Sequence, residues 1–319
     1  MKVLVVGFGS IAQKHLLNLQ QCYPQAELAV WCRAGRPRPA WALAGLFHSA
    51  QQALAWQPDY AIIASPASHH AEHVAALAPL GIPLLVEKPL AMDLRQGERL
   101  LSVAPPHCWL GYQLRFSEGY GCVRQWLPTL GRLYFARLEV GQYLPQWRPN
   151  TPVAEMVSAR AELGGGVLLE LSHELDYLVA LMGLPQSVYA RRGAASHLGL
   201  AVEECVELTL GYDGGALVQV HLDMLQYKPC RRAKWVGEGG QLEWDLLTNS
   251  VSVYDRQGEI CRHQQSAPAG VEMAQRQLQA FIEGTGEGTP AREGLAALRI
   301  IAAAQQAMAN GREQSIDDQ

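Results

Sequence analysis

Two residues of the sequence combine a reactive side chain with a local setting that is typical of a catalytic site. Lys88 comes directly after the apolar run at 81–86. A lysine there can hydrogen-bond a substrate oxygen, and its charge can stabilise a developing alkoxide. His173 follows the three glycines at 164–166, and an imidazole is a suitable general base near neutral pH. We therefore expect Lys88 and His173 to be catalytic, in a reaction that moves a hydroxyl proton.

Two carboxylates near His173 are candidates for orienting its imidazole. The apolar spacing predicts one helix over residues 168–182, in which His173 and Asp176 share a face. Glu170 lies three residues before His173 in the same segment. We include Asp176 and Glu170 among the expected catalytic residues, and the sequence leaves open which of them assists the histidine.

The first twelve residues match the fingerprint of a dinucleotide-binding turn. The apolar run at 3–6 is followed by GFGSIA at 7–12 and then by a helical pattern, which gives G-x-G-x-x-A between a strand and a helix. The glycines allow a tight turn and a close approach of backbone N–H groups to a pyrophosphate, whose charge the helix N-terminus favours. The alternative is a glycine-rich turn without a ligand. The residues expected to bind the cofactor here are Gly7, Gly9, Ser10, Ile11 and Ala12.

The end of the second expected strand, residues 27–32, bears on the choice between NAD and NADP. In dinucleotide-binding folds an acidic residue near this point usually holds the ribose 2′-hydroxyl. Here Arg33 follows the strand, with Arg36 and Arg38 in the same loop and no acid. Because arginine suits a 2′-phosphate, we favour NADP as the cofactor, with NAD as the other possibility. The alternative is that these arginines only coat a solvated loop.

Strands and helices alternate regularly over the first third of the chain. Further buried strands are expected at 59–64, 81–86 and 107–112, with helices between them, which predicts a parallel, doubly wound sheet. Ligands of such sheets lie beyond the carboxyl ends of the strands. We place this NAD(P)-binding α/β Rossmann domain at residues 1–118. Further residues at these strand ends that are expected to bind the cofactor are Ser65, Pro66, His70, Glu87 and Lys88 itself.

After Phe116 the pattern changes to short alternating strands. Turn signals at 213–215, 238–240 and 256–258 predict hairpins and therefore an antiparallel sheet. Two helices, at 271–283 and 291–310, are expected near the end, followed by a loose polar tail at 312–319. Residues 119–319 are thus predicted to form a C-terminal α+β domain that binds substrate and forms oligomers.

Several polar and aromatic residues are candidates for holding the substrate. The segment 144–149 places a tryptophan and an arginine between two prolines, which is typical of a rigid loop. Arginines can bind a substrate carboxylate or phosphate, and the alternative for each is ordinary surface solvation. The expected substrate-binding residues are Arg115, Tyr143, Trp147, Arg148, Arg160 and His173.

The order of these motifs resembles the Gfo/Idh/MocA family of nicotinamide-dependent oxidoreductases, which includes glucose–fructose oxidoreductase and inositol dehydrogenase. The resemblance rests on the G-x-G-x-x-A turn, Ser65-Pro66 with His70, Glu-Lys-Pro at 87–89, and the segment 164–176, and it covers essentially the whole chain. In that segment Ser172 replaces a family glycine and Glu170 the family aspartate. The family implies a Rossmann domain followed by a domain with an open, mainly antiparallel sheet. It also implies hydride transfer at a sugar or cyclitol hydroxyl, and a homodimer or homotetramer built through the second sheet.

The expected function is therefore NAD(P)-dependent hydride transfer at a hydroxyl or keto carbon of a sugar or sugar derivative. The Trp147 loop resembles members that act in cell-surface glycan synthesis, on nucleotide sugars or nonulosonic acids. One alternative is a redox-neutral epimerase or lyase that retains its cofactor. Another is a non-catalytic NADP sensor, against which the presence of both Lys88 and His173 argues.

Composition narrows the possible partners and compartment. The net charge of −4 gives no electrostatic basis for nucleic-acid binding, and no apolar run is long enough to span a bilayer. The chain begins Met1-Lys2 and enters a strand at once, so no signal peptide is expected. The seven cysteines contain no C-x-x-C pair, which indicates reduced thiols and a cytoplasmic protein. His69 and His73 lack further ligands nearby, so no metal site is expected.

Overall fold

The computed structural model describes residues 1–35, 42–193, 197–267 and 270–316. The chain forms two compact units. Unit 1 contains Met1–Tyr112 and Ala274–Leu298, and unit 2 contains Gln113–Met273 and Arg299–Gln319. The sequence predicts two contiguous domains, 1–118 and 119–319. In the structure, residues 274–298 belong to unit 1 instead.

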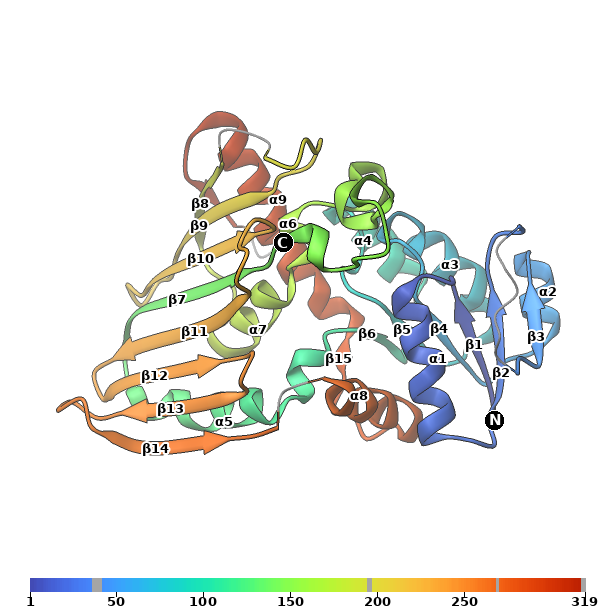
Figure 1. The fold of residues 1–319 in the computed structure, drawn as a ribbon, viewed down its shortest axis with the longest axis horizontal. Helices are drawn as coiled ribbons and strands as arrows, with labels where there is room; N and C mark the ends of the chain where they lie inside the picture. The colour runs from blue at the N-terminus through green and yellow to red at the C-terminus, as the bar shows by residue number, and fades with distance from the viewer. Residues whose placement is uncertain (36–41, 194–196, 268–269, 317–319) are drawn as a thin grey trace. The chain divides into compact units, whose positions relative to one another are not determined.

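Unit 1 is built on a seven-stranded sheet in the order β15-β6-β5-β4-β1-β2-β3 (Figure 1). The pairs from β3 to β6 are all parallel, and only the short β15 pairs antiparallel, with β6. This strand order is that of a Rossmann fold, so the predicted fold class is confirmed for this part of the chain. The strands are β1 Lys2–Val6, β2 Glu27–Trp31, β3 Gly45–Phe47, β4 Tyr60–Ile63, β5 Leu84–Val86, β6 Cys108–Leu110 and β15 Thr289–Pro290.

Two helices of unit 1, α2 and α4, begin at side chains that cap them. Ser49 accepts a hydrogen bond from the Gln52 backbone N–H at the start of α2, and Asp93 does the same for Gln96 in α4. The helices are α1 Ser10–Cys22, α2 Ala50–Ala55, α3 His70–Leu77, α4 Leu94–Val103 and α8 Val271–Glu283, whose first three residues belong to unit 2. Short 3₁₀ turns at Ala67–His69, Ala78–Leu80 and Ala291–Glu293 adjoin them.

Helix α8 completes the hydrophobic core of unit 1. Leu278 and Phe281 are buried in the same cluster as Val3 and Leu16, which belong to β1 and α1. Phe281 also meets the ring of Tyr60 edge-on, with 5.8 Å between ring centroids. The Rossmann unit is therefore closed by residues that lie more than 160 positions after the end of its last parallel strand, Leu110.

Unit 2 is built on a nine-stranded sheet in the order β14-β13-β12-β11-β7-β10-β9-β8-β16. All neighbouring pairs are antiparallel except β7 and β10, which run parallel. The three predicted hairpins join β9 to β10, β11 to β12 and β13 to β14, so the mainly antiparallel sheet is confirmed. The strands are β7 Leu133–Gly141, β8 Ser187–Arg192, β9 Cys205–Gly211, β10 Leu217–Asp223, β11 Cys230–Gly237, β12 Gly240–Asp245, β13 Ser250–Tyr254, β14 Ile260–Gln265 and β16 Gln314–Ser315.

One face of this sheet is apolar and packs against helices, which Figure 1 shows lying along it. In β10 the buried Val218 and Val220 alternate with the exposed Leu217 and Gln219. The absence of a side chain at Gly119 lets α5 approach β12, because a Cβ there would collide with the Trp244 indole. The helices are α5 Glu118–Trp126, α6 Val167–Glu170, α7 His173–Met182 and α9 Gly294–Asn310, which begins in unit 1. Short 3₁₀ turns in unit 2 are Gln113–Phe116, Leu127–Leu130, Leu144–Gln146, Val153–Glu155, Val157–Ala159 and Ala161–Leu163.

Two local predictions for unit 2 are wrong. The single helix expected over 168–182 is two helices, α6 and α7, separated by Leu171 and Ser172. The tail expected to be loose is held at Gln314 and Ser315, which pair with β8 as β16; residues 317–319 lie outside the described part. Among the described helices, none is long and apolar enough to cross a membrane.

Candidate functional site

The turn after β1 is shaped by Gly7. Its φ angle is +101°, and a Cβ would lie 2.7 Å from the carbonyl oxygen of Ala64, just beyond β4. Its backbone N–H also donates to the carbonyl of Trp31, at 2.8 Å. Gly7 therefore lies tightly between the ends of β2 and β4, where both the backbone angle and the space exclude any other residue.

The start of α1 fits the pyrophosphate of a dinucleotide. Gly9 is the N-cap, its helix has no side-chain cap and no acid in the first turn, and a Cβ at Gly9 would meet nothing within 4 Å. The first N–H groups of the helix, at Ser10 and Ile11, thus lack intrahelical partners at a positive helix end. Ala12 is fully buried against the sheet, as the fingerprint predicts.

His70 connects the loops that follow β4 and β5. It is 1% exposed. Its Nε2 lies 2.9 Å from the carbonyl oxygen of Ser65, and its Nδ1 lies 3.1 Å from that of Pro89. Burial lowers the pKa of this imidazole, and a neutral ring can donate to only one of the two carbonyls. The contacts make His70 a link between the Ser65-Pro66 loop and the Glu-Lys-Pro segment.

Glu87 is paired with a residue that the sequence analysis did not single out. Its Oε1 lies 2.6 Å from Nε2 of His15 on α1, and both residues are buried. The other carboxylate oxygen accepts a hydrogen bond from the Lys88 backbone N–H at 3.3 Å. The sequence indicated this pair only by placing a histidine three residues after Ala12, on the face of α1 that is buried. The pair fixes the end of β5, where Lys88 follows with its side chain half-buried.

Arg33 and His69 meet at the carboxyl ends of β2 and β4. Arg33 Nη2 lies 3.2 Å from His69 Nε2. Nearby, His73 Nδ1 lies 2.9 Å from Ser65 Oγ, and the His73 ring meets Trp31 edge-on at 4.8 Å. Burial lowers the pKa of His73 to about 4, so this imidazole is neutral near pH 7. Arg36 and Arg38, also expected here, lie outside the described residues.

In unit 2 the three glycines pack against the preceding chain. The N–H groups of Gly165 and Gly166 donate to the carbonyls of Arg160 and Ser158, both at 3.0 Å. A Cβ on Gly165 would lie 2.7 Å from the Ser158 carbonyl oxygen. The glycines are thus required for a close backbone contact that leads into α6 and places His173, which is 8% exposed, as the first residue of α7.

Two arginines hold the first turn of α7. Arg115 binds Asp176 through two hydrogen bonds, Nη2 to Oδ1 at 2.7 Å and Nε to Oδ2 at 3.0 Å. Arg231 on β11 binds the fully buried Glu174 in the same manner, at 2.7 and 3.1 Å. Such forked pairs fix the position of both partners. Two residues that closely follow His173 in α7, Glu174 and Asp176, are therefore tightly anchored.

These contacts bear on three predicted residues. The Asp176 carboxylate forms an ion pair with Arg115. Each of these two side chains therefore already has a partner within the protein. Glu170 is half-buried at the end of α6. The catalytic assignments of Asp176 and Glu170, and the substrate-binding assignment of Arg115, stay predictions. The Glu174–Arg231 pair had no signal in the sequence, because residues 57 positions apart meet only through the fold.

The remaining predicted substrate residues occupy the loop region before the glycines. Trp147 Nε1 donates to the carbonyl of Gln142 at 3.0 Å, so the indole closes its own loop. Tyr143 packs on Tyr227, with 4.8 Å between ring centroids. Arg148 is exposed, and the exposed Arg160 pairs with Glu162 at 2.7 Å. Their substrate-binding roles stay predictions.

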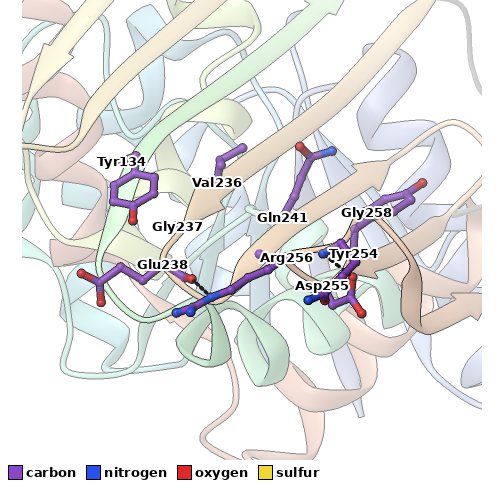
Figure 2. A pocket seen from close by; sticks show the side chains of 11 residues that line it. Tyr134, Val236, Gly237, Glu238, Gln241, Tyr254, Asp255, Arg256 and Gly258 are labelled. Carbon is purple, nitrogen blue, oxygen red and sulfur yellow. Dashed lines mark hydrogen bonds between the residues drawn. The ribbon is translucent and has the colours of Figure 1, made fainter.

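A separate hollow lies at the hairpin ends of the unit 2 sheet (Figure 2). It has a volume of about 860 Å³ and is lined by residues that include Tyr134, Gln241 and Tyr254. Arg256 Nε donates to the Glu238 carbonyl across its edge at 2.7 Å. None of the residues predicted to be functional lines it.

Two family models match the chain in succession. Residues 1–107 match the model described as "Oxidoreductase family, NAD-binding Rossmann fold", and residues 128–243 match the "GFO/IDH/MocA C-terminal domain". The chain belongs to the Gfo/Idh/MocA oxidoreductase family. The predicted resemblance and the oxidoreductase class are confirmed, and so is an N-terminal unit of the NAD-binding Rossmann type.

Within the family, one curated relative is myo-inositol dehydrogenase Hyg17 of Streptomyces leeuwenhoekii. It is 33% identical over 146 residues, which are 43% of this chain and 45% of that protein. This match thus spans less than half of the relative's length.

Two solved structures share the fold over essentially the whole chain. Levoglucosan dehydrogenase in complex with NADH has a TM-score of 0.85 at 15% identity, covering 99% of both chains. The WlbA dehydrogenase of Bordetella pertussis, in complex with NADH and UDP-GlcNAcA, has a TM-score of 0.78 at 21% identity, covering 100% of this chain and 99% of that one. At these identities the likeness shows the fold.

Proposed function

We propose that this family member transfers a hydride between a nicotinamide cofactor and a hydroxyl or keto carbon of a sugar or sugar derivative. The observation that carries the proposal is the anchored strand end at Glu87 and Lys88. It lies in the same sheet as a β1–α1 turn that fits a dinucleotide. A half-buried lysine on a fixed strand end suits an oxygen that changes between hydroxyl and carbonyl.

In this proposal the residues of unit 1 bind and orient. The helix start at Ser10 and Ile11 faces the pyrophosphate, and Gly9 leaves room for it. The bound cofactor supplies the hydride acceptor or donor. Lys88 donates a hydrogen bond to the reacting substrate oxygen and stabilises negative charge as it develops there. The His15–Glu87 pair holds the Lys88 backbone in place.

His173 acts as the general base in the oxidative direction. It accepts the hydroxyl proton of the substrate, and returns it in the reductive direction. The two arginine–carboxylate pairs of α7 limit the movement of its backbone. Asp176 and Glu170 remain the candidates for assisting the imidazole.

The cofactor proposed is NADP, with NAD as the other possibility. The support is chemical: residues 32–41 contain three arginines and no carboxylate, and arginine suits a 2′-phosphate. The solved relatives described above carry NADH, so the direct comparison of the two cofactors is the test.

The proposed substrate class is a polyhydroxylated ring, with nucleotide sugars or nonulosonic acids as the narrower candidates. Relatives are named for myo-inositol and levoglucosan, and one is bound to UDP-GlcNAcA. Arg148 and Arg160 are exposed arginines of unit 2, and a charged substrate would give them an anion to bind.

We also propose a cytoplasmic homodimer or homotetramer that uses the outer face of the unit 2 sheet. Facing residues across β9, β10, β7 and β11 carry charges of alternating sign, in the order Glu207, His221, Glu139 and Arg232. Such a row can pair with a second copy in opposite orientation. The seven cysteines, all within the described residues, form no disulfide, which supports a reducing compartment.

The test is nicotinamide absorbance with NADPH and NADH across a panel of cyclitols, sugars and nucleotide sugars. We expect Lys88→Met and His173→Ala to lower kcat by about 10²-fold or more. Matched controls are Lys14→Met on the exposed side of α1 and His107→Ala on an exposed loop, which should retain activity. Activity that survives both catalytic substitutions would refute the assigned roles. Substrate conversion without net cofactor consumption would instead support an epimerase or lyase.

A further inference from the structure

The guanidinium of Arg33 is held by a residue from another strand end. Arg33 follows β2, and His69 lies in the turn after β4; these two strands flank β1 in the sheet. Arg33 Nη2 lies 3.2 Å from His69 Nε2. Because a guanidinium only donates hydrogen bonds, the imidazole nitrogen must be the acceptor.

His69 itself is positioned by its surroundings. Its Nδ1 lies 3.7 Å from Oε2 of Glu72, which is in the first turn of α3, and its ring centroid lies 5.9 Å from that of His73. His73 is fixed in turn by Ser65 Oγ and by the edge of Trp31. The acceptor that faces Arg33 is thus a half-buried side chain beside a ring that Ser65 and Trp31 hold in place.

The local chemistry indicates which group the guanidinium serves. In dinucleotide-binding sheets the residue after β2 reads the 2′ position of the adenosine ribose. An exposed arginine loses rotamer freedom when it binds an anion, and it loses less if its fork is already held in place. No carboxylate in residues 32–41 competes for the guanidinium.

We propose that His69 is a positioning residue for Arg33, and that it determines the preference for a 2′-phosphate over a 2′-hydroxyl. By accepting the Nη2–H bond, it keeps the guanidinium at the end of β2 and leaves the remaining N–H groups to bind the phosphate. The inference rests on the proposed use of NADP. It adds a residue from the β4 loop, which lies 36 positions from Arg33 in sequence.

The probe pair is adenosine 2′,5′-bisphosphate and 5′-AMP, titrated calorimetrically into the full-length protein. We expect the wild type to bind the bisphosphate more tightly than 5′-AMP. His69→Ala should raise the dissociation constant of the bisphosphate about tenfold, which is the effect expected from the loss of one charge-assisted hydrogen bond. It should leave 5′-AMP binding and the thermal midpoint unchanged. His69→Gln, whose amide oxygen can still accept from Arg33, should recover most of the loss, and His107→Ala is the control.

Kinetics give a second readout of the same role. In His69→Ala the KM for NADPH should rise while the KM for NADH and both kcat values stay the same. In Arg33→Ala the 2′-phosphate preference should be lost, and adding His69→Ala should change it no further.

The outcomes separate this inference from the proposed cofactor. If the wild type binds both probes equally and Arg33→Ala changes nothing, the NADP proposal fails and the role of His69 fails with it. If Arg33→Ala abolishes the preference but His69→Ala does not alter it, only the role of His69 is overturned. Equal weakening of both probes by His69→Ala would also overturn it, because it would indicate general damage to the site.

Discussion

At the scale of single residues, the two glycines of the β1–α1 turn have different physical roles. Gly7 has a positive φ angle and no room for a Cβ beside Ala64. Gly9 has a φ of −78°, an ordinary value for any residue, and open space around it. In this motif the fold therefore requires Gly7, whereas only a bound ligand would require a glycine at position 9.

This difference predicts opposite outcomes for two identical substitutions. Gly7→Ala should lower the free energy of unfolding by about 1–3 kcal/mol, because it adds backbone strain and a clash. Gly9→Ala should leave stability within about 0.5 kcal/mol of the wild type, while weakening dinucleotide binding because the methyl group occupies the approach to α1.

Urea denaturation measures the first quantity, and NADPH fluorescence titration measures the second. A stable Gly7→Ala protein would contradict the tight turn seen between β2 and β4. Full NADPH affinity in Gly9→Ala would contradict the placement of the pyrophosphate at this helix start.

At the same scale, the sequence was informative where chemistry is local. The fingerprint at 7–12, the Glu-Lys-Pro segment and the position of His173 after three glycines were all read from short patterns. The His15–Glu87 pair was missed because its members are 72 positions apart. A pairing of that kind depends on which helix face meets which strand end, and the folded sheet decides this.

At the scale of elements, the sheet of unit 2 contains a charged cross-strand group. His221 on β10 lies 2.6 Å from Glu207 on β9, through Nδ1, and 2.9 Å from Asp223, through Nε2. The hydrogen bond with Asp223, aided by the one with Glu207, outweighs burial and raises the pKa of His221 to about 9. The folded protein thus binds this proton more tightly than the unfolded chain does.

This group predicts a pH-dependent contribution to stability. The contribution is complete below the ordinary histidine range, about pH 6.5, and it is lost as the pH rises through about 9. We expect His221→Gln to lower the thermal midpoint at pH 6 by about 2 °C or more, and to lower it progressively less as the pH approaches 10. Thermal unfolding of both proteins over this pH range is the measurement. A midpoint difference that grows with pH would contradict the assignment.

Elements also show where sequence patterns fail. The apolar positions of α6 and α7 continue in one helical pattern, so the interruption at Leu171 and Ser172 carried no signal. Ser172 is fully buried there, and its carbonyl accepts the Asp176 N–H that starts α7. Strand β14 was indicated only by the turn signal at 256–258, because all of its side chains are exposed and it lacks the alternation that identifies a half-buried strand.

At the scale of the whole molecule, the Rossmann unit is assembled from two distant parts of the chain. β15 pairs with the edge strand β6, and the Tyr60 hydroxyl donates to the Ile282 carbonyl at 3.1 Å. Together with Leu278 and Phe281 in the core, these contacts make residues 274–298 an integral part of unit 1.

The arrangement predicts the behaviour of fragments. Residues 1–118 alone should lack a cooperative thermal transition, because α1, β4 and β6 would expose the surface that α8 and β15 cover. A chain that joins residues 1–112 to 274–298 through a flexible linker should regain cooperative unfolding and bind NADPH. Calorimetry of the two fragments is the test, and cooperative unfolding of 1–118 by itself would show that the late segment is dispensable.

The same connectivity sets an order of events during synthesis. A ribosome that adds about 5–20 residues per second releases the six parallel strands early, but the segment that closes their sheet emerges only after the whole nine-stranded sheet apart from β16. For many seconds the nascent chain therefore carries an unfinished nucleotide-binding unit with an uncovered edge at β6. We expect unit 2 to be able to fold first in most of its length, although it is encoded second. We then expect the incomplete N-terminal unit to bind molecular chaperones until α8 has been synthesised.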